Sequence, residues 1–364
     1  MIHNEFKRVL VAPLDWGSGH ATRCIPVIRA LLAQNAIPVL AGSKRVLARL
    51  NADFPELEQV HLPDLEIKYS KILPAWLAVL LQAALIKKVI SKEKYLLKGI
   101  VHQHKIDAVI SDNRYGLSGS GVPSVIITHQ LNLPIPWALR IFGFIAQNYV
   151  NKMLSKFDEV WVPDVEGKPN FSGKLSEIKT RKNVHFIGPL SRFENEQSQT
   201  QIKYDVAIIL SGPAPQPEIM LQSILQNLPA TVKQVVILSV NEYPVLKVSN
   251  DVTINWKINA SDDEFSSSLE ASTFIIARSG YSTLMDLIQL NRNAILIPTP
   301  GQTEQNYLTR HFEEHFGCVA MHQNAISAEA MERKMRELSL KKGCDFKNVG
   351  NGLKRVVNSF LKGT

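Results

Sequence analysis

Two blocks of alternating segments constrain the fold of this chain more than any other feature. In each block, short apolar runs alternate with longer amphipathic ones, as in RVLVAPL at 8–14 followed by IPVIRALLAQ at 25–34. Short apolar runs between segments of helical periodicity predict buried parallel strands joined by helices. The polar stretch ENEQSQTQIK at 194–203 has no apolar periodicity and separates the two blocks. We therefore expect an α/β protein with two Rossmann-like domains.

The length of the chain also favours two domains, because 364 residues exceed one compact core of typical size. We expect an N-terminal domain at 1–190, a linker at 191–203, a second domain at 204–345 and a closing helix at 346–364. Ligands of such sheets bind outside the carboxyl ends of the strands. Both blocks carry glycines, hydroxyls and charged residues at those ends, so we expect two crevices that face each other across a cleft.

Composition limits the classes of partner. The net charge of +8 and the pI near 9.2 suit an anionic ligand or surface. Dispersed basic residues and an aromatic content of 7% argue against nucleic acid. The three cysteines form no CxxC pair, so we expect neither a disulfide framework nor a zinc site. With no apolar run long enough for a signal peptide at the N-terminus, we expect a cytoplasmic protein.

The most apolar stretch, Ile72–Ile86, leads into a segment with five lysines, Lys87, Lys88, Lys92, Lys94 and Lys98. It is shorter than a membrane span requires. Two readings stay open: an amphipathic packing helix with a solvated basic face, and a peripheral contact with the inner face of an anionic membrane.

The second block contains the sharper signal, ARSGYSTLMDLIQL at 277–290 and IPTPGQTEQ at 297–305. A strand that runs through Ser-Gly into a helix offers backbone N–H groups and hydroxyls to a diphosphate. Asp286 lies about one turn into that helix, where its carboxylate can accept hydrogen bonds from ribose hydroxyls. A similar turn, ILSGP at 209–213, follows an earlier strand. The candidate residues for binding a nucleotide diphosphate and a sugar attached to it are Ser211, Gly212, Arg278, Ser279, Gly280, Ser282, Thr283, Asp286, Gln302, Glu304 and Gln305. The competing explanation is ordinary turn chemistry, with Arg278 an exposed arginine without a role.

The first strand ends in GSGH at 17–20, which places a titratable ring where a helix begins. A histidine has a pKa near neutrality and can act as a general base toward a hydroxyl group. His20 is therefore a candidate catalytic residue, and a helix-capping role is its alternative.

These motifs together resemble the GT-B glycosyltransferases, in particular the MurG and UDP-glycosyltransferase families. In those families a Gly, an acidic ribose ligand and a Gln that contacts the donor sugar follow one another at the spacing of Gly280, Asp286 and Gln305. Glu304 matches an acidic residue of many UDP-glycosyltransferases. Asn306 departs from the second Gln of MurG, so the donor sugar stays open.

The resemblance also implies roles in the first block. It makes Asp112 the orienting partner of His20, with Asp15 as the competing acid. GSGH resembles the N-terminal glycine-rich loop of MurG, and THQLN at 128–132 resembles its HEQN stretch. The residues expected on the acceptor side are Gly17, Gly19, His129, Gln130 and Asn132. A polar strand end that satisfies its own backbone is the alternative for the last three.

The function implied by the resemblance is inverting transfer of a hexose or N-acetylhexosamine from a UDP-sugar to an envelope glycan or a lipid-linked acceptor. No DxD pair is evident, so we expect neither a metal nor a cofactor beyond the donor substrate. Because GHATRC at 19–24 also resembles the start of a nucleotide-sugar hydrolase, a hydrolase or a non-hydrolysing epimerase on the same fold stays an alternative. A non-catalytic binding subunit is a third possibility, which His20 and the Glu304-Gln305 pair argue against.

Overall fold

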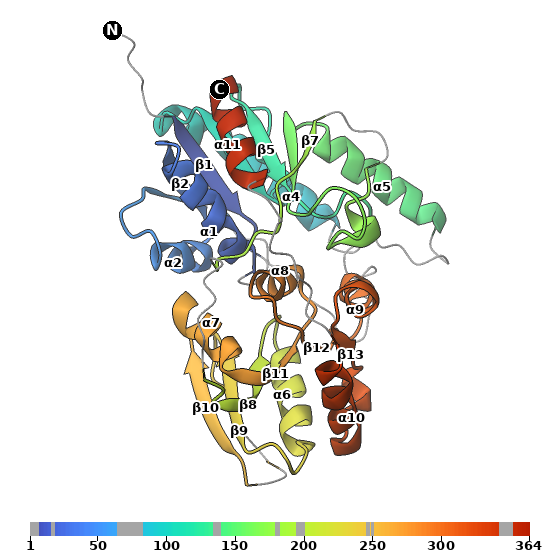
Figure 1. Cartoon of the computed structure of the whole chain (residues 1–364). Helices are drawn as coiled ribbons and strands as arrows, with labels where there is room; N and C mark the ends of the chain where they lie inside the picture. The colour runs from blue at the N-terminus through green and yellow to red at the C-terminus, as the bar shows by residue number, and fades with distance from the viewer. Residues whose placement is uncertain are drawn as a thin grey trace. The chain divides into compact units, whose positions relative to one another are not determined.

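Two parallel sheets with helices between their strands organise the chain, which confirms the predicted α/β class (Figure 1). The computed structural model describes residues 7–15, 19–63, 83–133, 140–178, 183–193, 201–244, 248, 251–341 and 352–364. The chain divides into two units, Met1–Arg192 with Asn348–Thr364 and Phe193–Lys347. The predicted linker at 191–203 lies largely outside the described residues, and the cleft stays a prediction.

The sheet of the first unit has the strand order β3-β2-β1-β4-β5-β6-β7. Its strands are β1 (Arg8–Pro13), β2 (Ile37–Gly42), β3 (Gln59–His61), β4 (Ala108–Asp112), β5 (Ser124–Ile127), β6 (Glu159–Val162) and β7 (Val184–Phe186). Its helices are α1 (Gly19–Leu32), α2 (Lys44–Asn51), α4 (Ala83–Gln103), α5 (Arg140–Leu154), the 3-10 turn η2 (Gly173–Leu175) and α11 (Gly352–Gly363). The connections leave β1 and β4 in opposite directions, so the carboxyl ends of these two strands form the topological switch point.

Helices cover both faces of this sheet, which explains why its strands are apolar at successive positions. Val9 and Val11 pack on one face with residues of α1, α2 and α11. Leu10 and Ala12 pack on the other face with residues of α4. Ile126, on the face that carries α4, packs with residues of α5. A first strand buried from both sides is therefore fixed in place, and with it the point from which α1 begins.

The closing helix α11 packs into the first unit, although it follows the whole of the second unit in sequence. Val356, Val357 and Phe360 belong to the core cluster of α1 and β1. The Phe360 ring meets Trp161 of β6 edge to face, with centroids 5.6 Å apart and an interplanar angle of 84°. The first unit thus contains a helix that sequence reasoning had kept as a separate segment.

The sheet of the second unit has the strand order β10-β9-β8-β11-β12-β13. Its strands are β8 (Tyr204–Ile209), β9 (Gln234–Ser239), β10 (Thr253–Ile258), β11 (Ser272–Ala277), β12 (Ile295–Leu296) and β13 (Val319–Ala320). Its helices are α6 (Gln216–Gln226), α7 (Asp262–Glu270), α8 (Tyr281–Gln289), α9 (Thr303–His315), the 3-10 turn η3 (Gln323–Ala325) and α10 (Ala328–Ser339). Here the switch point lies between β8 and β11, the strands that lead into ILSGP and ARSG.

Some sequence-predicted segments fall outside the described residues. Gly17 is one of them, and so is most of the Ile72–Ile86 stretch, of which α4 includes only the last residues. Among the helices in the described part of the chain, none is long and apolar enough to cross a membrane.

Candidate functional site

Asp112 is the last residue of β4, at the switch point of the first sheet. The backbone N–H of Leu14 donates to its carbonyl oxygen at 2.9 Å, which ties the ends of β1 and β4 together. Directly after it, Asn113 adopts a left-handed conformation with φ of 57°, which asparagine tolerates better than most residues. The Ser111 hydroxyl closes this turn by donating to the Arg114 carbonyl at 2.7 Å. The Asp112 side chain is fully buried and projects from a rigid strand end.

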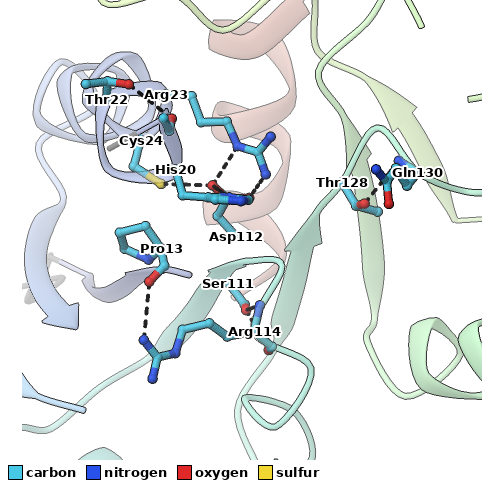
Figure 2. Close-up of polar contacts among 11 residues, drawn as sticks. Pro13, His20, Thr22, Arg23, Cys24, Ser111, Asp112, Arg114, Thr128 and Gln130 are labelled. Carbon is cyan, nitrogen blue, oxygen red and sulfur yellow. Dashed lines mark hydrogen bonds and ion pairs between the residues drawn. The ribbon is translucent and has the colours of Figure 1, made fainter. Parts of the chain in front are cut away.

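His20 is the second residue of α1 and meets Asp112 directly (Figure 2). The distance between His20 Nδ1 and Asp112 Oδ2 is 3.0 Å, and 15% of the His20 side chain is exposed. The competing acid, Asp15, instead accepts from Arg45 Nε of α2 at 3.0 Å. The structure therefore brings together the pair that the family resemblance implied, while the catalytic role of the pair stays a prediction.

Two further side chains of α1 converge on the same carboxylate, and sequence reasoning missed both. Arg23 Nε donates to Asp112 Oδ2 at 2.6 Å, and Arg23 Nη2 donates to Oδ1, so the ion pair is bidentate. The Cys24 thiol lies 3.9 Å from Oδ2. His20, Arg23 and Cys24 follow one another at helical spacing, which aims all three at β4. The spacing of HATRC was the available signal.

The charges in this cluster shift the pKa values of its members. For Asp112, burial acts to raise the pKa, but the Arg23 charge and His20 outweigh it and hold the pKa at about 2. For His20, burial and then the Arg23 charge lower the pKa, against the opposing effect of Asp112. Burial and the Asp112 charge raise the pKa of the Cys24 thiol well above its usual value. At neutral pH the cluster thus holds an ionised Asp112, a neutral His20 and an unreactive Cys24.

A second buried ion pair, between Arg114 and Glu93, lies near the carboxyl ends of these strands. Arg114 Nε donates to Glu93 Oε1 of α4 at 2.8 Å. The same guanidinium donates to the carbonyls of Pro13 and Pro63, at 3.3 and 2.7 Å. Burial raises the pKa of Glu93, against the effect of Arg114. Arg114, which follows β4, thereby connects the last residue of β1 and the residues after β3 with α4.

The acceptor-side residues divide into three groups. Gly19 begins α1, and its carbonyl accepts from the Thr22 hydroxyl at 3.0 Å. His129 is buried, and the Gln130 backbone N–H donates to Thr128 Oγ1 at 3.1 Å, at the end of β5 (Figure 2). The Asn132 amide donates to the carbonyls of Lys174 and Glu177, at 2.9 and 2.8 Å. These contacts favour the backbone-satisfying alternative for Asn132.

In the second unit, the helices around the switch point begin without side-chain caps. α6, α8 and α9 follow β8, β11 and β12, and none of the three has a side-chain hydrogen bond at its N-cap. By contrast, Ser261 caps α7 in a full capping box and Ser327 caps α10. Helix N-termini without caps are suited to an anion. The helices suited to bind an anion are therefore α6, α8 and α9, which follow β8, β11 and β12.

The candidate donor residues of α8 lie on the more accessible side of that helix. Ser282, Thr283 and Asp286 are half-buried, whereas Tyr281 and Leu284 are buried in the core. Residues three and four positions apart lie on one helix face, so the two hydroxyls and the carboxylate can reach one ligand. Gly280 is the N-cap of α8, and Ser211 and Gly212 follow β8 at the neighbouring strand end.

Arg278 is buried, with 1% of its surface exposed, so the alternative of an exposed arginine without a role is wrong. Its guanidinium donates to the Gln216 carbonyl of α6 at 3.0 Å and to Gln323 Oε1 at 2.6 Å. It also donates to the carbonyls of Ile297 and Pro298, each at 3.2 Å. Burial lowers its pKa to about 10, so the charge persists at neutral pH. Arg278 thus connects the start of α6, the residues after β12 and the turn η3, and this arrangement does not support the predicted direct contact with a diphosphate.

Ser279, two residues before α8, is also buried and contacts α9. Its hydroxyl donates to the Gln305 carbonyl at 3.0 Å and accepts from Thr309 Oγ1 at 2.7 Å. The Gln305 side chain is held as well: Oε1 accepts from the Thr299 N–H at 2.8 Å, and Nε2 donates to Gln302 Oε1 at 2.6 Å. An amide retains further hydrogen-bonding capacity in this arrangement. Gln305 is therefore fixed in orientation and still able to bind a hydroxyl, with half-buried Glu304 beside it.

Within the described residues, no group of three or more His, Cys, Asp or Glu side chains is arranged to hold a metal ion. The metal-independent reaction stays a prediction.

Comparison with known proteins adds a family match to this geometry. Residues 215–351 match the glycosyltransferase family 28 C-terminal domain. A search of curated proteins finds no match to the sequence.

Solved structures show the same fold along nearly the whole chain. MurG of Acinetobacter baumannii is 14% identical, with a TM-score of 0.57, over 98% of this chain and 100% of its own. Arabidopsis thaliana UGT89C1, complexed with UDP-L-rhamnose, is 14% identical, with a TM-score of 0.58, over 99% of this chain and 95% of its own. The Streptomyces glycosyltransferase SsfS6, complexed with thymidine diphosphate, is 13% identical, with a TM-score of 0.59, over 98% and 99%.

The chain therefore has the GT-B fold, and the match of residues 215–351 to a glycosyltransferase domain supports its assignment to the glycosyltransferases. The resemblance to MurG and the UDP-glycosyltransferases is thereby confirmed. The family match covers most of the second unit, because residues 215–351 match the glycosyltransferase family 28 C-terminal domain and the unit comprises Phe193–Lys347.

Proposed function

We propose that the protein transfers a hexose or an N-acetylhexosamine, with inversion and without a metal, from a UDP-sugar to a hydroxyl group of an envelope glycan or lipid-linked acceptor. The observation that carries this proposal is the 3.0 Å contact between His20 Nδ1 and Asp112 Oδ2. A histidine held in this way by a buried carboxylate is suited to accept the proton of an attacking alcohol.

The chemistry of the step follows from the orientation of the ring. With Nδ1–H donating to Asp112, Nε2 is the basic nitrogen and accepts the proton of the acceptor hydroxyl. The hydroxyl oxygen forms a bond to the anomeric carbon from the face opposite the leaving group, which inverts the configuration. The bond between the anomeric carbon and the diphosphate oxygen breaks, and its electron pair leaves with the nucleoside diphosphate. Asp112 stabilises the imidazolium formed.

The donor-binding part of the proposal depends on the second unit. The uncapped N-termini of α6, α8 and α9 can stabilise the negative charge that develops on the leaving diphosphate. We assign the ribose to Asp286 and the transferred sugar to Glu304 and Gln305. One related structure contains UDP-L-rhamnose and another thymidine diphosphate, so both nucleotides belong in the test.

We also propose a peripheral contact with anionic membrane through α4 and α5. The α5 side chains Phe144, Ile145 and Tyr149 are 69%, 65% and 49% exposed. The five lysines of α4 are exposed as well, and both helices pack on the same face of the sheet. Exposed apolar groups near clustered lysines favour binding to anionic lipid.

Vesicle sedimentation tests this contact. The protein should sediment with phosphatidylglycerol vesicles and not with phosphatidylcholine vesicles, and Ile145→Ser should weaken the binding. Sedimentation that ignores lipid charge and the substitution would contradict the contact.

Activity assays test the transferase proposal. UDP-glucose, UDP-N-acetylglucosamine and the corresponding dTDP-sugars are incubated with a membrane extract as the acceptor source, and the anomeric configuration of the product is read by NMR. We expect a β-linked product from an α-linked donor, and His20→Ala should lower kcat by about 10²–10⁴-fold. His104→Ala is the matched control, since His104 Nδ1 contacts Glu58 Oε1 at 2.5 Å in another histidine–carboxylate pair.

Other products would contradict the transferase proposal and identify a different reaction. Sugar released without an acceptor identifies a hydrolase, and an epimerised donor identifies an epimerase. An α-linked product excludes inversion, and an unimpaired, folded His20→Ala protein excludes His20 as the base.

A further inference from the structure

The Asp112 carboxylate is shared between a histidine and an arginine, which is one group more than a histidine–aspartate pair requires. Arg23 takes both carboxylate oxygens, through Nε at 2.6 Å on Oδ2 and through Nη2 on Oδ1. His20 takes Oδ2 at 3.0 Å. Arg23 is buried, with 3% of its side chain exposed, so water does little to screen its charge.

We propose that Arg23 is a positioning residue of the His20–Asp112 pair: it fixes which carboxylate oxygen faces the imidazole, and its charge offsets that of Asp112 so that His20 stays neutral. The inference rests on the proposed function of His20 as a general base. Arg23 itself contacts no reacting atom in this scheme.

The geometric part follows from the bidentate contact. A carboxylate can rotate about its last side-chain torsion when one neighbour alone holds it. Two parallel N–H···O bonds from a planar guanidinium fix the plane of the carboxylate. Because Arg23 lies one helical turn after His20 on α1, the same helix delivers both the imidazole and the clamp.

The electrostatic part follows from the charges that surround the imidazole. α1 contributes Arg23 and the Cys24 thiol, β4 contributes Asp112, and the loop after β5 contributes His129. Asp112 alone would favour the imidazolium, whereas Arg23 beside it opposes a second positive charge. The lowered pKa of His20, caused by burial and by Arg23, agrees with this balance. A neutral imidazole is the form that can accept a proton.

The test measures the protonation of His20 in the intact protein. In a sample with 15N-labelled histidines, the His20 signal is assigned by its loss in His20→Gln and titrated from acid to neutral pH. The parent midpoint should lie below the ordinary value of 6.5. Arg23→Met should raise the midpoint by about 1 pH unit or more, and Arg23→Lys should leave it close to the parent value while kcat falls.

Arg29→Met is the matched control, because Arg29 also lies on α1 and donates to the Arg192 carbonyl at 2.9 Å, away from Asp112. It should leave the midpoint in place. The acid limb of kcat/KM should move with the midpoint in Arg23→Met, a shift that lost stability alone would not produce.

An unchanged midpoint in Arg23→Met, or an equal rise in Arg23→Lys, would overturn the inference. If Arg23→Met does not fold, a parent midpoint above 6.5 overturns it by itself. A protein that transfers no sugar removes the proposed function, whereas the midpoints still decide what Arg23 does to His20.

Discussion

Asp112 links the stability of the first unit to pH. Its pKa lies at about 2 in the folded protein against an ordinary value of 3.8, because Arg23 and His20 outweigh the effect of burial. A lowered pKa of an acid stabilises the fold above the ordinary value, and this stabilisation is lost as pH falls from 3.8 toward 2. The contribution at neutral pH is about 2 kcal/mol.

Urea unfolding of the parent and Asp112→Asn, measured between neutral pH and pH 2, checks this expectation. The difference in unfolding free energy should be constant above about pH 5 and shrink below pH 4. A difference that persists undiminished at the acid end would contradict the assignment.

At the residue scale, His20 is predictable because it follows a buried strand, and the family resemblance implies Asp112, 92 positions on, as its partner. Arg23 was missed because nothing in HATRC shows that Asp112, 89 positions on, meets it. Arg278 was considered as a ligand or an idle surface residue, since four acceptors from three loops bury it only after folding.

Helix N-termini separate stability from ligand binding in the second unit. The Ser261 hydroxyl caps α7 by accepting from the Glu264 N–H at 3.2 Å, whereas α8 begins at Gly280 without a side-chain cap. Ser261→Ala should lower the unfolding free energy by about 1 kcal/mol and leave UDP affinity unchanged. Asp286→Ala should weaken UDP binding and leave stability close to that of the parent.

Calorimetric titration with UDP and urea unfolding of both variants check the two halves of this prediction. Loss of UDP binding in Ser261→Ala, or normal UDP binding in Asp286→Ala, would contradict the assignment of the donor site to α8.

At the element scale, most strands and helices are predictable from their apolar patterns, including the three-residue edge strand β7 in VHFIG at 184–188. The edge strands β3 and β13, of three and two residues, are not. α1 begins at Gly19, before the apolar run that predicts it. Its first turns contain His20 and Arg23, which contact Asp112. The candidate site therefore lies in the part of α1 that amphipathic periodicity does not reveal.

The whole molecule depends on a long-range contact made by α11. The Phe360 ring packs edge to face on Trp161 and belongs to the core cluster of α1 and β1. Phe360→Ala should lower the unfolding free energy of the first unit by about 3–5 kcal/mol and leave UDP binding by the second unit intact. Lys362→Ala on the same helix is the control, and urea unfolding followed by tryptophan fluorescence measures both. Equal stability of the two variants would show that α11 contributes little to the first unit.

At this scale, two Rossmann-like sheets are predictable because the alternation of apolar and amphipathic runs can be recognised from neighbouring residues alone. The position of α11 was left open, since an amphipathic helix shows which face it buries and not which unit it covers. The division at Arg192 and at Asn348 depends on contacts between distant segments.

The place of α11 in the fold affects the order in which a nascent chain can fold. On the ribosome, domains generally form from the N-terminus onward. Here the core around Trp161 lacks its last helix until the whole second unit has been synthesised. The second unit can thus fold while the first is still incomplete. A chain truncated before α11 would therefore consist of a folded second unit attached to an incomplete first unit.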